Sequence, residues 1–216
     1  MSLARKAAAE FVGTAVFLTA IVGVNYPATP TVLATAVLAT ALGLMVLLTS
    51  TTSGGHLNPA VTLFFAVKKE ISWGNAVTYM AAQILGGIFG AWLGGQLHGG
   101  APVVVNAADT TSGQFLSEIV ATAGLVWLIG NLAARERGNI IPLVVALWVF
   151  SAANFTSSGA SANPAVTIAR FFTPVAGIGV QQGAYWIIAE VIGVLIAILG
   201  LMFVTPLAAK KKAKKK

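Results

Sequence analysis

Ser53-Gly-Gly-His-Leu-Asn-Pro-Ala-Val-Thr-Leu63 returns later in the chain as Ser158-Gly-Ala-Ser-Ala-Asn-Pro-Ala-Val-Thr-Ile168, and this repeated motif decides the fold. The similarity continues upstream, where Glu10-Phe-Val-Gly-Thr-Ala-Val16 is echoed by Glu118-Ile-Val-Ala-Thr-Ala-Gly124. The register therefore holds over whole halves of the chain, which a chance match of one tripeptide cannot explain. We expect two structurally equivalent repeats.

The composition places these repeats in a membrane. Of 216 residues, 57% are apolar, only 9% are charged and none is cysteine, whereas globular domains have about 25% charged residues. No Asp, Glu, Lys or Arg occurs from Phe11 to Val67 or from Ile71 to Ala108. These features exclude a disordered chain, a coiled coil, a nucleic-acid-binding domain and a disulfide scaffold.

Six apolar runs are long enough to cross a bilayer as helices, which takes about 20 residues each. They cover residues 8–25, 31–51, 76–98, 115–134, 139–157 and 181–206. The first run could be mistaken for a secretory signal, but it has a counterpart in the second half, so we expect a retained helix. Two further apolar pieces, 59–67 and 164–172, are too short to span the bilayer.

Each repeat contains three spans, an odd number, so the second repeat must enter the membrane from the opposite side. The repeats cover about residues 4–98 and 113–207 of a single transmembrane domain, 1–209, which a basic tail follows at 210–216. The two short pieces then dip into the membrane from opposite faces. Their identical Asn-Pro-Ala beginnings should meet near the midplane.

The basic residues predict the orientation of the chain. Twelve of the thirteen lie on alternate connections, on one side of the predicted membrane: Arg5, Lys6, Lys68, Lys69, Arg135, Arg137 and the six tail lysines. The opposite connections carry only Asp109. The positive-inside rule therefore places both termini in the cytoplasm. The tail is read as a solvated topology anchor, with binding to anionic lipid as the alternative.

Asn-Pro-Ala suits the start of a half-helix. Asn is a favoured N-cap residue, and proline at the first helical position loses no hydrogen bond. If the Asn side-chain oxygen caps its own helix, its NH2 group is free to donate into a pore. The residues concerned are Asn58, Pro59, Ala60, Asn163, Pro164 and Ala165.

The non-helical approaches to these motifs carry backbone carbonyls that lipid cannot satisfy, so they must be buried in protein or line water. The candidate pore-lining backbone comprises Gly54, Gly55, His56, Leu57, Gly159, Ser161 and Ala162. A row of acceptors leading to two donors suits a file of water or small polyols and excludes ions. His56 could also act as a pH gate.

With two Asn-Pro-Ala motifs in inverted repeats of three spans, residues 4–207 resemble the aquaporin (major intrinsic protein) family. The resemblance implies an all-α membrane protein: a right-handed bundle of six transmembrane helices plus two re-entrant half-helices. It also implies one pore per subunit, a homotetramer and, for a prokaryotic-type member, the inner (plasma) membrane.

One departure from the family concerns its selectivity filter. Most members place Arg directly after the second Asn-Pro-Ala, where this chain has Val166. Arg170 follows one helical turn later and could replace that charge only in an unusual pore. Ungapped spacing puts the other filter positions at Leu38, Ser151 and Ala160. A wider, less polar constriction with a weaker proton barrier is expected, as in bacterial members that permeate trivalent arsenic.

Four polar residues within the spans have two interpretations. Glu10, Glu118 and Glu190, with Gln83 at the position that matches Glu190, could form a proton relay in a coupled transporter. Alternatively, they support the irregular loops by accepting backbone hydrogen bonds. The repeat symmetry and the amide at Gln83 favour loop support.

We therefore expect a passive channel for water and small neutral solutes: glycerol, urea, hydrogen peroxide or the neutral hydroxides of arsenic and antimony. A strictly water-selective channel and a proton-coupled secondary transporter are the alternatives. No nucleophile–base pair indicates an enzyme. No cofactor, metal site or nucleic-acid partner is expected, since the sequence has no cysteine and only two histidines.

Overall fold

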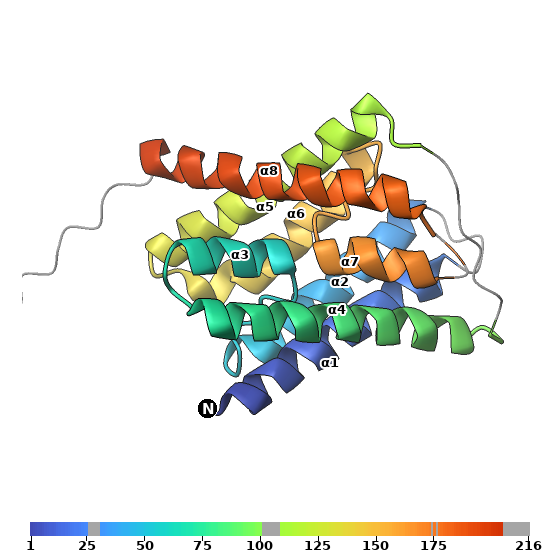
Figure 1. Cartoon of the computed structure of the whole chain (residues 1–216), viewed down its shortest axis with the longest axis horizontal. Helices are drawn as coiled ribbons and strands as arrows, with labels where there is room; N and C mark the ends of the chain where they lie inside the picture. The colour runs from blue at the N-terminus through green and yellow to red at the C-terminus, as the bar shows by residue number, and fades with distance from the viewer. Residues whose placement is uncertain (26–30, 101–108, 174, 176, 205–216) are drawn as a thin grey trace, which may run out of the picture.

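The computed structural model describes residues 1–25, 31–100, 109–173, 175 and 177–204, and the regular secondary structure of this part of the chain is entirely helical (Figure 1). Its elements are α1 (Leu3–Val24), α2 (Thr31–Ser50), α3 (Pro59–Val67), α4 (Trp73–Gln96), α5 (Ser112–Ala134), η1 (Gly138–Ile140), α6 (Ile141–Phe155), α7 (Pro164–Ala169), η2 (Arg170–Phe172) and α8 (Val180–Val204). The basic tail predicted at 210–216 lies outside the described residues.

Six helices are long and apolar enough to span a bilayer: α1, α2, α4, α5, α6 with its preceding turn η1, and α8. This confirms the six predicted spans, with small shifts at their ends. The largest shift is at α1, which begins at Leu3 because the Ser2 hydroxyl caps it by accepting from the Arg5 backbone N–H at 3.4 Å. Arg5 and Lys6 are therefore helical, although the apolar run begins after them.

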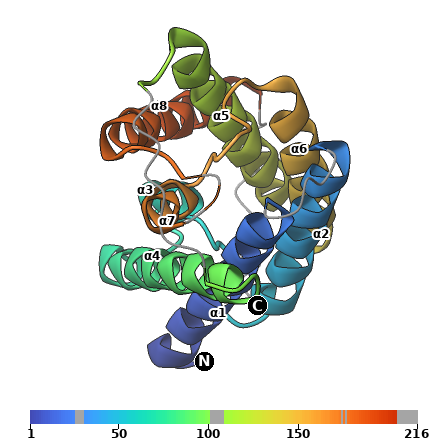
Figure 2. The ribbon, with the colours of Figure 1, turned by 90° about the vertical axis from the view of Figure 1, so that its right-hand side faces the viewer.

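The half-helices α3 and α7 begin at the predicted prolines. Asn58 caps α3 by accepting from the backbone N–H of Ala60 at 2.8 Å, and Asn163 caps α7 through the N–H of Ala165 at 3.0 Å. Figure 1 shows α3 and α7 pointing in opposite directions from the centre, and Figure 2 shows them nearly superposed, so they lie end to end. They lie between α4 and α8, and each of these two helices packs against both of them.

Small residues let the first and third spanning helices of each repeat pack closely. In the first repeat α1 lies along α4, and in the second α5 lies along α8. A Cβ atom built on Gly86 would lie 2.3 Å from the Phe11 carbonyl oxygen, and one on Gly90 only 2.1 Å from that of Ala15. In the second repeat a Cβ on Gly193 would lie 2.8 Å from the carbonyl oxygen of Ile119. Such seams replace the hydrophobic driving force that lipid does not provide.

The repeats also interlock through their half-helices. Besides contacting its own repeat, α3 packs against α8, and α7 packs against α4. A Cβ on Gly87 of α4 would lie 3.1 Å from the carbonyl oxygen of Ala165 in α7. Each half-helix is therefore held by helices of both repeats, which fixes where their tips meet.

Replacing Gly90 with alanine should destabilise the protein by about 1–3 kcal/mol, because the new methyl group meets rigid backbone rather than a movable side chain. The expected result is a lower thermal unfolding midpoint in detergent. It is measured by size-exclusion chromatography of the protein that remains folded after heating. Gly74→Ala is the matched control, since a Cβ there meets nothing within 4 Å. Equal midpoints for the two variants would show that the α1–α4 seam is not tightly packed.

Candidate functional site

Hydrogen bonds between the first residues of the two half-helices join them at the centre. Asn58 Nδ2 donates to the carbonyl oxygen of Ala162 at 2.8 Å, and Asn163 Nδ2 donates to that of Leu57 at 2.9 Å. Each asparagine thus bonds to the residue immediately before the other one. This reciprocal pair locks the tips of α3 and α7 together.

The two asparagines also border an internal cavity. A carboxamide has two N–H donors, and the described structure uses one from each residue in the crossed pair. Asn58 and Asn163 both line the cavity and are 5% and 4% exposed. The second N–H of each side chain is therefore available to a molecule passing the junction.

The carboxylate of Glu10 organises the loop before α3. One oxygen accepts from the backbone N–H of His56 at 3.0 Å and from the hydroxyl of Ser53 at 2.5 Å. The other accepts from the backbone N–H of Leu57 at 2.6 Å and from the amide of Gln83 at 2.7 Å. All four donors lie in or against the loop, so Glu10 fixes its course.

The second repeat reproduces this arrangement before α7. The carboxylate of Glu118 accepts from the backbone N–H of Ser161 at 3.0 Å and from that of Ala162 at 2.7 Å. Glu190 accepts from the backbone N–H of Asn163 at 3.0 Å. Glu10, Glu118 and Glu190 are fully buried and do not line the cavity.

The repeats differ where Gln83 corresponds to Glu190. Gln83 donates to Glu10 and, at 2.9 Å, to the hydroxyl of Thr62. Glu190 instead accepts from the hydroxyl of Thr167 at 2.8 Å, and its Oε2 atom has no hydrogen-bond partner in the described part of the chain. The second repeat therefore buries one carboxylate more than the first.

These carboxylates hold a strained backbone. Leu57, Ala160 and Ala162 have φ angles of 47°, 54° and 45°, a left-handed conformation that costs about 1–2 kcal/mol per non-glycine residue. Leu57 and Ala162 supply the carbonyls bonded by the asparagines, and their own N–H groups bond to Glu10 and Glu118. Strain concentrated at a few positions is typical of functional sites.

His56 forms part of the wall on the α3 side. Its Nδ1 atom lies 3.1 Å from the hydroxyl of Thr62, its ring stacks on Phe65 with 4.7 Å between centroids, and Tyr79 meets it edge-on at 5.4 Å. The imidazole is therefore held in one orientation where it borders the cavity.

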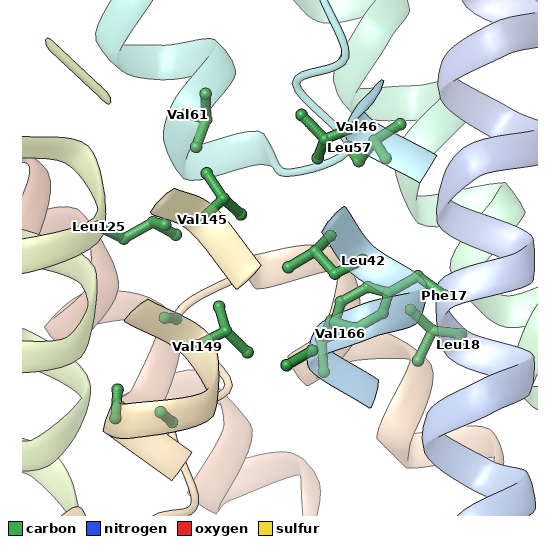
Figure 3. Packing of buried hydrophobic residues seen from close by; sticks show 14 of the residues in the cluster. Phe17, Leu18, Leu42, Val46, Leu57, Val61, Leu125, Val145, Val149 and Val166 are labelled. Atoms are coloured by element: carbon green, nitrogen blue, oxygen red, sulfur yellow. The ribbon is translucent and has the colours of Figure 1, made fainter. Parts of the chain in front are cut away.

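The cavity has a volume of about 460 Å³ and two unlike walls. One wall consists of the non-helical approaches and the two asparagines. The other consists of apolar side chains at helical spacing on α1, α2, α5 and α6: Phe17, Ile21, Leu38, Leu42, Val46, Leu125, Ile129, Val145 and Val149. Figure 3 shows several of these side chains converging from the surrounding helices.

Three of the four predicted filter residues, Leu38, Ala160 and Val166, line this cavity. Ser151 does not. It is exposed, and its hydroxyl donates to the carbonyl oxygen of Leu147 at 2.9 Å within α6. From α6 the cavity is lined instead by Val145, Val149 and Ala153, which lie on one helical face. The filter position that ungapped spacing predicts on α6 therefore lies on the wrong face of that helix.

The predicted backbone positions also divide. Among those that line the cavity are Gly54, Gly55, His56, Gly159, Ser161 and Ala162. Leu57 contributes its carbonyl oxygen while its side chain is buried in the core. The prolines and alanines of the motifs are buried within the half-helices and do not border the cavity: Pro59, Ala60, Pro164 and Ala165.

Arg170 lines the cavity although it was not among the predicted filter positions. Its Nη1 atom donates to the Ser161 hydroxyl at 3.1 Å. Position 170 follows 166 by one helical turn, a spacing visible in the sequence. The apolar wall gave no comparable signal, because helices in lipid are apolar on every face.

Comparisons with known proteins agree with this geometry. A family model described as "Major intrinsic protein" matches residues 1–156. The chain is 35% identical to "Aquaglyceroporin AqpS" of Rhizobium meliloti (strain 1021) over 207 residues, which cover 91% of this chain and 88% of that protein. It is 34% identical to human "Aquaporin-5" over 211 residues, covering 88% and 76% of the two chains.

A solved structure has the same fold. The aquaglyceroporin from Plasmodium falciparum superposes with a TM-score of 0.76 and covers 94% of this chain and 95% of its own, at 19% sequence identity. The likeness extends over both repeats, so the arrangement of spans and half-helices is shared as a whole.

Asn163→Asp should separate capping from donation at the junction. The carboxylate can still accept from the Ala165 N–H but cannot donate to the Leu57 carbonyl, so about 1–3 kcal/mol of stability should be lost. Osmotic water permeability per protein molecule should also fall. Asn75→Asp, in the first turn of α4, is the control and should leave both unchanged. Wild-type stability and permeability in Asn163→Asp would contradict a role for the crossed bond.

Proposed function

This chain belongs to the major intrinsic protein family, and we propose that its pore admits neutral solutes of glycerol size as well as water. Membership of that family and the aquaporin and aquaglyceroporin relatives make it a passive membrane channel for water and small solutes. The observation that carries the finer proposal is the pairing of one polar wall with one apolar wall around a cavity of about 460 Å³.

Such a cavity suits polyols and related hydroxylated molecules. Their hydroxyl groups can exchange hydrogen bonds with the asparagine amides and loop carbonyls, while their carbon faces contact the valines and leucines opposite. The volume is also large beside the approximately 30 Å³ that one water occupies in the liquid. Small pores lined mainly by apolar groups with a few placed polar groups select by shape and hydrogen-bond pattern.

Val166 supports the same conclusion. It is 4% exposed and lines the cavity with Leu38 and Ala160. A valine at this position takes up less of the constriction than an arginine and brings no charge. We assign the filter to Leu38, Val149, Ala160 and Val166, with Asn58 and Asn163 as the central donors.

The candidate solutes are glycerol, urea, hydrogen peroxide and the neutral hydroxides of arsenic and antimony. "Aquaglyceroporin AqpS" carries glycerol in its name, and we extend that solute class to this chain. A proton-coupled transporter is disfavoured because the three buried glutamates do not border the cavity and bond to loop backbone instead. We propose that the protein acts as a channel and not as an enzyme.

The topology and assembly follow from charge and surface. The ends of α3 and α5, the start of α1 and the end of α8 lie at one end of the bundle (Figure 1). The described basic residues outside the pore belong to these helix ends and the turns beside them: Arg5, Lys6, Lys68, Lys69, Arg135 and Arg137. We therefore place both termini in the cytoplasm of a prokaryotic cell. We propose a homotetramer in the inner membrane, with one pore per subunit. The outer faces of the single chain are apolar; Leu48, Leu147 and Ile196 are among its exposed side chains.

Stopped-flow light scattering of proteoliposomes tests the solute range. Wild-type vesicles should shrink quickly in sucrose with a low activation energy, and should swell faster than empty vesicles in glycerol and urea. Arsenite uptake, measured by rapid filtration, should rise as well. Glycerol and urea rates equal to those of empty vesicles would leave only a water channel.

Val166→Arg should narrow the constriction and lower glycerol permeability at least about tenfold, the effect of roughly 1.4 kcal/mol, while water permeability falls less. Val67→Arg, at an exposed position of α3 that does not line the cavity, is the matched control and should leave glycerol flux unchanged. An unaltered glycerol rate in Val166→Arg would show that the filter lies elsewhere.

A further inference from the structure

We propose that Arg170 is the cationic residue of this pore's filter: its guanidinium, supplied from one turn beyond Val166, excludes cations and protons while the valine leaves room for larger neutral solutes. This inference rests on the proposed channel function and goes beyond it by naming a specificity-determining residue.

The position of Arg170 makes this possible. It is the first residue of η2, directly after α7, and four residues after Val166, which is about 6 Å along a helix. Helical side chains lean toward the N-terminal end of their helix. A long arginine side chain at 170 therefore returns to the level of the loop that precedes Asn163, and it does lie there, since Nη1 bonds to Ser161 at 3.1 Å.

Among the contacts of the guanidinium, two with described residues hold it at the cavity wall. On one side is the Ser161 hydroxyl, and Ser161 itself lines the cavity. The guanidinium carbon also lies 5.2 Å from the centroid of the Trp186 ring, which is 1% exposed. A cation stacked on a buried aromatic ring and bonded to a loop hydroxyl has little freedom to leave. Arg170 thus borders the pore as a fixed charge.

The charge is also matched by the surrounding protein. Trp186 lies one helical turn before Glu190 on α8, and Glu190 is the additional buried carboxylate of the second repeat, where the first repeat has the neutral Gln83. Arg170 is the single basic residue that this sequence places in the second repeat away from the predicted membrane surface. The second repeat therefore contains both the additional buried carboxylate and an arginine within the membrane.

Arginine keeps its charge at any physiological pH. A unit positive charge at a pore wall repels cations, because Coulomb interactions are only weakly screened away from bulk water. This would restore the barrier to ions that Val166 alone lacks, without narrowing the constriction at position 166. The pore would then be wide for neutral hydroxylated molecules and closed to cations.

The test compares proton and water flux in the same proteoliposomes, with a trapped pH-sensitive dye and light scattering. Arg170→Gln should raise proton flux relative to water flux by about tenfold or more, as expected when one nearby charge is removed. Moving the charge to the other position, in Val166→Arg/Arg170→Gln, should bring the ratio back toward wild type. Arg5→Gln, exposed at the start of α1, is the matched control and should not change it.

If Arg170 serves only as the counterion of the buried glutamates, the variants should behave differently. In that case Arg170→Gln would lower the unfolding midpoint without changing the flux ratio, and Val166→Arg would give no rescue. If Arg170→Gln does not fold, Arg170→Gln/Glu190→Gln removes both charges and should also raise proton flux relative to water flux above the wild-type ratio. An unchanged ratio in the folded variant overturns the proposal. Failure of the channel function itself would appear separately, as wild-type vesicles no more permeable to water than empty ones.

Discussion

The structure depends on the satisfaction of backbone hydrogen bonds in the middle of a membrane. The half-helices α3 and α7 begin there, and a stretch of non-helical chain leads to each of them. In this region an unpaired peptide group costs several kcal/mol. The crossed bonds from Asn58 and Asn163 and the buried carboxylates of Glu10 and Glu118 meet this requirement. The chain needs charged groups in its core to make an irregular loop possible.

The same requirement produces the pore. The buried glutamates that accept hydrogen bonds from the loops lie on the side of the loops away from the cavity. The polar groups that the loops present to the cavity are therefore backbone carbonyls and the second N–H groups of the asparagines. Nothing comparable acts on the opposite side, where α1, α2, α5 and α6 present mainly apolar side chains, with Thr31 and Thr35 of α2 as polar exceptions. A cavity with one polar and one apolar wall follows from how the re-entrant loops are built.

Much of this could be predicted from the sequence, and the failures share one cause. The half-helices begin at the predicted residues because Asn and Pro are strong local signals, and the repeat register located Glu10 and Glu118. Ser151 was misplaced because no such signal exists along α6, where lipid-facing and cavity-facing positions are equally apolar. Only the three-dimensional packing distinguishes the face of Val145 and Val149 from the face of Ser151.

The inverted repeat is least symmetric where the pore needs to be specific. Backbone support is nearly identical in the two halves, with matching serines, threonines and glutamates around matching loops. Among the exceptions are His56 opposite Ser161, Gln83 opposite Glu190 and the presence of Arg170. A duplicated scaffold can build the passage, but two identical halves would give identical mouths. On our proposal, part of the selectivity comes from residues that break the symmetry: Arg170, the Trp186 ring against which it lies and the additional buried carboxylate of Glu190.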